Sequence, residues 1–357
     1  MKNIHFKRKT VKIALISMML FIGVISIGLM GYVKTNYDES FFRVDKPDPK
    51  YSGYLRYSDI DDYYERTEIT FESGGNALKG CVYGSENDKG LVVISVGLGF
   101  GAENYLAETL YFVDNGWRVL TFDNTGTHES EGESTMGPSQ SLLDLYAALT
   151  YIHGDQRLNN LPVMLYGHSW GGYAVTAILD SRFDIAAVAS IAGFNSPMEL
   201  LNEQVDSLLG AFSPIAYPFL WTYQNILFGN TAWVTATNGI NSTDTPVMII
   251  HGVKDEAIAY NGASIIAHRD EIINPNVIYK TNSAENHDGH NNLFESDAAS
   301  EYAKTKNLEY KEIYNLYDGE IPDEIKEEYY EGVDRFRTSE LDLDFMDEIN
   351  FFFEKQL

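Results

Sequence analysis

The residues best suited to chemistry lie in one short motif, Gly167-His168-Ser169-Trp170-Gly171-Gly172. An apolar run at 162–166 precedes it, and a run at 173–179 with the composition of a helix follows it. A strand, Gly-x-Ser-x-Gly and a helix form a nucleophile elbow, a sharp turn that lifts the serine hydroxyl above a sheet and has glycines where side chains would clash. The motif predicts that Ser169 is a catalytic nucleophile. An ordinary glycine-rich turn is the alternative.

A nucleophilic serine needs an imidazole base, and the base needs a carboxylate to orient it. After a nucleophile elbow the acid and the base follow in that order, on loops at the ends of later strands. The apolar run 247–250 leads to Asp255, which we expect to be the acid, with Glu256 as the fallback. The next strand-like run leads to two candidate bases, of which we favour His290 over His287.

The same histidine loop contains ligand types that bind metals. His287 and His290 lie three residues apart with Asp288 between them. Two histidines at this spacing without a further fixed ligand are weak evidence for a metal. We therefore expect neither a metal nor a cofactor.

The alkoxide formed on serine attack needs two backbone N–H donors, which form an oxyanion hole. We expect one from Trp170, directly after the nucleophile, and one from Leu98, in the glycine-rich loop 97–101. A phosphate-binding loop is the alternative for residues 97–101. The spacing there is not Gly-x-Gly-x-x-Gly and no Walker lysine follows, so the pattern favours an oxyanion loop.

Strand-like and helix-like segments alternate along the body of the chain. Two alternating segments around Gly74-Gly75-Asn76 predict a hairpin, and continuous apolar runs after it are typical of strands buried on both faces. The strand-like segments are 66–72, 77–83, 91–96, 117–122, 162–166, 185–191, 247–250 and 277–280, with helix-like segments at 102–115 and 139–153. The alternation predicts an α/β fold with a mostly parallel, doubly wound sheet of about eight strands.

Two regions interrupt this alternation. Residues from about 195 to 244 are rich in Leu, Phe, Tyr and Trp and lack the pattern of a buried strand. We expect a helical lid that supplies an apolar pocket over the carboxyl edge of the sheet, with additional core helices as the alternative. The second region, about 309–338, is an acidic, tyrosine-rich extension before a final amphipathic helix.

The first residues form a separate unit. Residues 13–33 carry no charge and, at about 1.5 Å per residue, are long enough to cross the ~30 Å hydrocarbon core of a bilayer. The run is longer than a signal-peptide core and lacks an Ala-x-Ala-like site, so we predict a retained transmembrane anchor, with a cleaved signal as the alternative. The basic segment 1–12 would lie on the cytoplasmic side of the cell membrane. Residues 34–61 would then be a tether to an external body at 62–357 in a single-pass protein.

Composition excludes some partners. The chain has 52 acidic and 26 basic residues, a formal net charge of −26. Such a surface repels nucleic acid, so no nucleic-acid partner is expected. Cys81 is the only cysteine, which rules out an intramolecular disulfide. The sequence does not indicate an oligomeric state.

Taken together, these motifs resemble the α/β-hydrolases, in particular the bacterial serine-aminopeptidase-like and monoacylglycerol-lipase-like esterases. The similarity covers roughly 67–357 and is carried by the loop 97–99, the segments 122–126 and 130–132, the elbow at 167–172, and the loops of Asp255 and His290. The chain departs from these relatives in two places. Val96-Gly97 replaces their usual His-Gly, which removes a side chain that braces the oxyanion loop, and the segment 123–128 replaces Asp-x-Arg-Gly-x-Gly.

The residues and the resemblance predict a membrane-anchored serine hydrolase. It would cleave an ester or a related small-molecule acyl substrate through an acyl-serine intermediate. A serine aminopeptidase-like peptidase and a non-catalytic binding protein on the same fold are the alternatives, because a fold does not determine a substrate.

Overall fold

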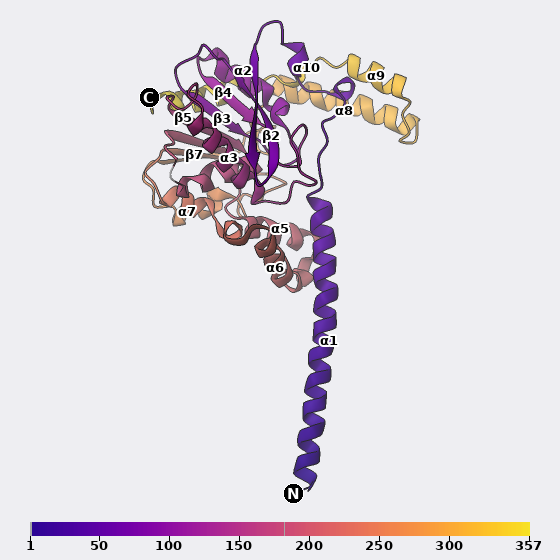
Figure 1. Cartoon of the computed structure of the whole chain (residues 1–357). Helices are drawn as coiled ribbons and strands as arrows, with labels where there is room; N and C mark the ends of the chain where they lie inside the picture. The colour runs from indigo at the N-terminus through magenta and orange to yellow at the C-terminus, as the bar shows by residue number, and fades with distance from the viewer. Residues whose placement is uncertain (1, 182) are drawn as a thin grey trace.

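The computed structural model describes residues 2–181 and 183–357. Figure 1 shows a body built around one sheet and a single long helix, α1 (Lys2–Ser40), that projects from it. The body contains the site, and the end of α1 that meets the body also contributes to it.

The sheet has eight strands in the order β1-β2-β4-β3-β5-β6-β7-β8. β1 and β2 form the predicted hairpin and β2 pairs antiparallel with β4, whereas all the other pairs are parallel. The strands are β1 (Arg66–Ser73), β2 (Asn76–Tyr83), β3 (Leu91–Ser95), β4 (Arg118–Phe122), β5 (Val163–His168), β6 (Ala187–Ile191), β7 (Val247–Gly252) and β8 (Val277–Asn282). The prediction of a mostly parallel sheet of about eight strands is confirmed.

Helices cover both faces of the sheet, which explains the continuous apolar runs of its central strands. One face packs against α3 (Gln140–Gly154), α4 (Trp170–Ala177) and α7 (Ala236–Asn241). The other packs against α2 (Leu106–Asp114) and α11 (Leu343–Glu354). Short 3₁₀ turns are η1 (Pro49–Tyr51), η2 (Tyr57–Asp59), η3 (Ala102–Tyr105), η4 (Ile178–Asp180), η5 (Gly210–Ile215), η6 (Gly229–Trp233) and η7 (Ile265–Glu271).

The region 195–244 is helical, but it divides into two parts. Helices α5 (Pro197–Leu209) and α6 (Tyr217–Phe228) lie outside the layers of the sheet and form the lid. Helix α7 belongs to the core instead, because Ala236 and Ile240 are fully buried there. The predicted lid and the alternative of extra core helices therefore each describe part of this region.

One helix in the described part of the chain is long and apolar enough to cross a membrane, Lys12–Ser40 of α1. The predicted tether over 34–61 differs from the structure. α1 continues to Ser40, and the chain after it packs on the body, with Leu55 and Ile60 buried. The guanidinium of Arg43 also donates to three backbone carbonyls of the segment 128–132. Residues 41–61 are therefore a segment packed on the body and not a free tether.

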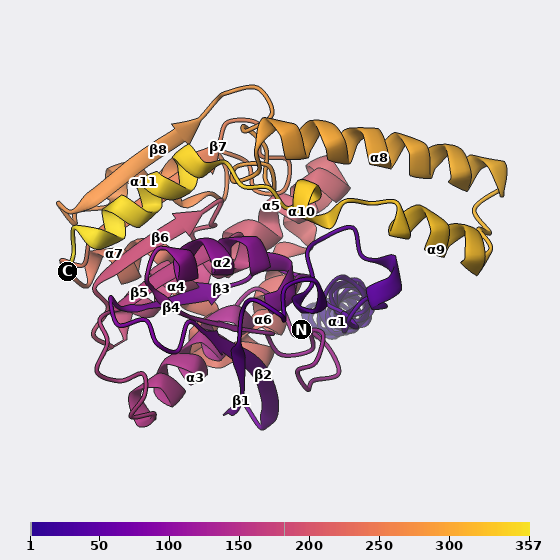
Figure 2. The same ribbon diagram turned by 90° about the horizontal axis from the view of Figure 1, so that it is seen from above.

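The C-terminal extension is a pair of helices, α8 (Asp297–Leu316) and α9 (Asp323–Glu331), followed by α10 (Arg335–Thr338). Figure 2 shows α8 and α9 side by side, projecting away from the sheet. Tyrosine rings join the two helices, Tyr310 lying 4.9 Å from Tyr329 between ring centroids. The extension lies apart from the lid (Figure 1).

Candidate active site

Ser169 occupies the turn between β5 and α4. Its backbone has φ 56° and ψ −114°, a conformation that L-residues rarely adopt. The turn is held by its amide, which donates to the Ile191 carbonyl at 2.8 Å. Glycines are required beside it: a Cβ on Gly171 would lie 1.9 Å from the Ser95 carbonyl oxygen, and one on Gly167 2.4 Å from that of Gly171. The local geometry is that of a nucleophile elbow.

The structure brings the predicted acid and base to this serine. The hydroxyl of Ser169 lies 2.8 Å from Nε2 of His290, and Nδ1 of His290 lies 2.8 Å from Oδ2 of Asp255. Asp255 follows β7, and His290 lies in the loop after β8, so three carboxyl ends of parallel strands supply the three side chains. In this chain of hydrogen bonds Ser169 donates to His290 and His290 donates to Asp255.

The carboxylate of Asp255 is held by further donors. Its Oδ1 accepts the amides of Ala257 and Ile258 at 2.9 and 2.8 Å. Nε2 of His251 lies 3.1 Å from Oδ2. Burial would raise the pKa of Asp255, but the hydrogen bonds from His251 and His290 outweigh it and hold the pKa below its ordinary value. Asp255 is therefore ionised at neutral pH and can stabilise a protonated imidazole.

The other candidates lie elsewhere. Glu256 accepts the backbone amide of His290 at 3.3 Å rather than its ring. The ring of His287 lies beside Asp297 and Asp342, at 3.3 and 3.9 Å, and does not reach the serine. In the described residues no group of three or more His, Cys, Asp or Glu side chains is arranged to hold a metal.

Trp170 and Leu98, the two predicted oxyanion donors, line the same cavity as Ser169. Trp170 is the first residue of α4, so its amide is one of the free N–H groups of a helix N-terminus. Leu98 lies in the loop after β3. That loop lacks the bracing His of the relatives, but the hydroxyl of Tyr105 takes over this task by accepting the amide of Gly97 at 3.0 Å.

Sequence reasoning gave no role to a buried polar chain behind the serine. The Tyr105 hydroxyl donates to Nδ1 of His168 at 2.7 Å, and Nε2 of His168 donates to the His290 carbonyl at 3.0 Å. Burial, together with the nearby His290, lowers the pKa of His168 to about 3, so the ring stays neutral. The signal in the sequence was His168 itself, a titratable residue in an elbow whose other positions, apart from the nucleophile Ser169, are tryptophan or glycine.

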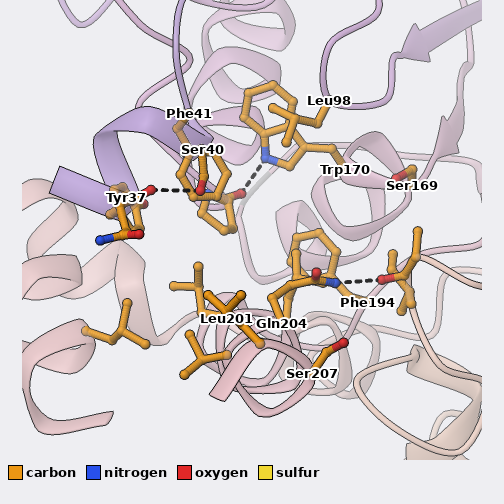
Figure 3. Close-up of a pocket in the computed structure, with 18 of the residues that line it drawn as sticks. Tyr37, Ser40, Phe41, Leu98, Ser169, Trp170, Phe194, Leu201, Gln204 and Ser207 are labelled. Carbon is orange, nitrogen blue, oxygen red and sulfur yellow. Dashed lines mark hydrogen bonds between the residues drawn. The ribbon is translucent and has the colours of Figure 1, made fainter. Parts of the chain in front are cut away.

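A cavity of about 720 Å³ opens at Ser169, within the range of small-molecule sites. Figure 3 shows Ser169 and Trp170 on one side and Tyr37, Ser40 and Phe41 of the α1 end on the other. Helix α5 closes a third side. Among the described residues that line the cavity, none is an aspartate or a glutamate.

Comparison with known proteins agrees with this geometry. Residues 86–227 match the family model described as serine aminopeptidase, S33. The chain has the α/β-hydrolase fold. It is similar in fold to the esterase Pf2001 of Pyrococcus furiosus, with a TM-score of 0.53 and 18% identity over 76% of this chain and 97% of that one.

Two curated proteins resemble part of this chain. The lysophosphatidylserine lipase ABHD12 of Danio rerio is 26% identical over 149 residues, 41% of this chain and 37% of the lipase. The polyketide transferase af380 of Aspergillus fumigatus is 27% identical over 169 residues, 43% of this chain and 58% of the transferase. The similarity thus spans less than two thirds of either relative.

Proposed function

We propose that this α/β-hydrolase cleaves a carboxylic ester through an acyl-serine intermediate. Ser169 attacks the carbonyl carbon while His290 accepts its proton, and Asp255 stabilises the imidazolium that forms. The amides of Leu98 and Trp170 bind the oxyanion. His290 then protonates the departing alcohol, and a water activated by the same imidazole hydrolyses the acyl-serine. The observation that carries the proposal is the continuous hydrogen-bonded chain from Ser169 to Asp255.

The test is the Ser169→Ala variant of the full-length protein. The wild type should react with a fluorophosphonate probe and release p-nitrophenol from p-nitrophenyl butyrate, with an initial burst if deacylation is slow. The variant should lose both, because the probe bonds to the activated hydroxyl. Labelling that persists in Ser169→Ala would remove this residue as the nucleophile. A wild type with no turnover would favour a non-catalytic binding protein.

An aminopeptidase on the same machinery is the second candidate, favoured by the family model that matches residues 86–227. An enzyme for free N-termini needs a carboxylate near the site to pair with the substrate ammonium. The apolar, acid-free lining of the described cavity supports an ester instead. A panel of acyl esters against aminoacyl anilides separates the two, and faster cleavage of the anilides would reverse the assignment.

We also propose that residues 13–33 remain as a single membrane span with the body outside the cell. The length, the lack of charge and the basic residues before the span support this topology. Protease added to intact cells should digest the body, and the membrane-bound protein should have its full-length mass. A mature protein that begins beyond residue 33 would show a cleaved signal.

A further inference from the structure

The lid is packed against the membrane-spanning end of α1. Val33 is buried in a cluster with Leu201 and Leu220 of the lid, and Met30 packs at its margin. One turn further along, Tyr37 stacks edge-to-face on Tyr223 at 5.1 Å between ring centroids. Because Met30 and Val33 belong to the uncharged run 13–33, the lid must lie at the depth where α1 leaves the bilayer.

The part of the lid that begins at Ser207 carries no charged side chain, although surfaces that face water normally do. From 207 to 243 the chain contains no Asp, Glu, Lys, Arg or His, although charged residues make up 22% of the whole sequence. Apolar side chains nevertheless stand exposed there, with Phe212 at 71% and Ile226 at 67% of full exposure. Trp221 and Trp233 form an exposed pair, 5.3 Å between ring centroids. Indole rings at such a position are typical of the lipid headgroup region.

The cavity connects this membrane level to the serine. Tyr32 and Val33, the last residues of the uncharged run, line the same cavity as Ser169 and His290. Most of the remaining lining is apolar, and α5 contributes a large share of it, including Leu201 (Figure 3). An acyl chain that leaves the bilayer along α1 would therefore reach Ser169 without crossing water.

We propose that the outer face of the lid, formed by Phe212, Ile215, Trp221, Ile226 and Trp233, is seated in the bilayer, and that the substrate is an amphiphilic long-chain ester taken up from that bilayer. The partner is a lipid surface rather than a protein, since the patch is continuous with the membrane helix and free of charge. The acidic body repels anionic headgroups, so the uncharged stretch 207–243 is the part of the surface suited to approach lipid. This inference rests on the proposed esterase activity and adds its substrate class.

Tryptophan fluorescence tests the contact with lipid directly. The chain has four tryptophans; Trp117 and Trp170 are buried in the body and none lies in 13–33. In phosphatidylcholine vesicles, lipids brominated near the headgroup should quench the emission of the full-length protein. The Trp221→Phe/Trp233→Phe variant should lose the quenched component. Emission that brominated lipid leaves unchanged would overturn the seating of the lid.

Activity tests the uptake of substrate. The Phe212→Ser/Ile226→Ser variant should cleave 4-methylumbelliferyl oleate dissolved in phosphatidylcholine vesicles about tenfold more slowly, because less apolar surface enters the bilayer. Its rate on soluble 4-methylumbelliferyl acetate should stay within about twofold of wild type. The matched control is Leu308→Ser/Leu316→Ser on α8, which removes two equally exposed leucines at the far end of the body (Figure 1) and should change neither rate.

The outcomes separate the two proposals. A wild type inactive on both esters refutes the proposed function. A wild type active on the acetate but inactive on the oleate in vesicles refutes only the bilayer substrate. A lid variant that retains the full oleate rate, or loses both rates equally, also refutes the inference that the lid delivers the substrate.

Discussion

The two walls of the cavity are held together in different ways. The wall of Ser169 is held by directed hydrogen bonds between buried polar groups, from Gly97 through Tyr105 and His168 to the backbone of His290. The facing wall, where α1 meets the lid, is held chiefly by an apolar cluster. Buried polar groups lose much when one partner is removed, whereas apolar contacts tolerate exchange at similar volume. We therefore expect substitutions in the wall of Ser169 to lower the catalytic rate strongly. Substitutions in the facing wall should change the substrate preference by smaller steps.

The largest expected effect is on the polar wall. His290→Ala should lower kcat for a soluble ester by about 10³-fold or more, since the base of a triad is lost. His287→Ala should change kcat less than about threefold, because this ring lies beside Asp297 and Asp342 instead of the serine. Steady-state rates of both variants on p-nitrophenyl butyrate test this assignment. A larger loss in His287→Ala than in His290→Ala would make His287 the catalytic base.

On the apolar wall, a larger side chain should change the preferred length of the acyl chain and leave the catalytic residues unaffected. Ser207 lines the cavity on α5 (Figure 3), so Ser207→Trp should fill space that a long acyl chain needs. We expect kcat/KM for a decanoate ester to fall about tenfold relative to an acetate ester, the scale of misfit in an apolar pocket. Asn238→Trp, on the exposed side of α7, is the control. Equal losses on both esters would mean that this wall does not select the acyl chain.

An effect of similar size is expected from Tyr105, which braces the oxyanion loop. Tyr105→Phe leaves the amide of Gly97 and Nδ1 of His168 without their buried partner, a loss of about 1–3 kcal/mol in such settings. Tyr105 is a positioning residue, so kcat should fall about tenfold while KM stays nearly constant. Tyr166→Phe is the matched control: its hydroxyl is equally buried but has no hydrogen-bond partner among the described residues. A rise in KM alone would place Tyr105 in substrate binding.

The catalytic residues of the polar wall could largely be predicted from the sequence, because they follow the ends of strands. Ser169 and Asp255 each follow a recognisable buried strand at a fixed offset. The choice between His287 and His290 depended on an irregular loop. There Gly252 allows a close approach of the chain, since a Cβ on it would lie 2.4 Å from the Asp288 carbonyl oxygen. A contact of this kind cannot be predicted from the spacing of residues along the chain.

The apolar wall could not be predicted. The composition of α1 is explained by a membrane alone, so nothing in it indicates that Val33 and Tyr37 also pack on protein. Helix α6 of the lid is only weakly amphipathic, so its sequence does not show which of its sides packs on protein. The hydrogen bonds of Tyr105 and His168 likewise join segments far apart in the chain. Only the three-dimensional arrangement shows that the helix that contains the uncharged run 13–33 also lines the site.

The last expected effect is on the stability of the fold. It tests whether the ring of His168 is neutral in the folded protein, in contrast to the ionised Asp255. His168 has a pKa lowered to about 3 in the folded protein, against about 6.5 for an unfolded chain. Below pH 6.5 the unfolded state binds a proton that the folded state does not. The free energy of unfolding should therefore fall as pH drops from 6.5 toward 3, by at most about 1.4 kcal/mol per pH unit from this group.

Urea unfolding of the full-length protein in a mild non-ionic detergent, at pH 7 and pH 5, measures this slope. His168→Gln removes the titrating ring, so the variant should be less stable at pH 7 yet lose less stability between the two pH values than wild type. His128, whose pKa burial also lowers, is present in both proteins, so the difference between the two slopes isolates His168. Asp255 does not interfere, because a carboxylate with a lowered pKa loses its contribution only below its ordinary range. Equal slopes in the two proteins would mean that His168 titrates normally, and the hydrogen-bonded chain from Gly97 to His290 would then not be held in its neutral form.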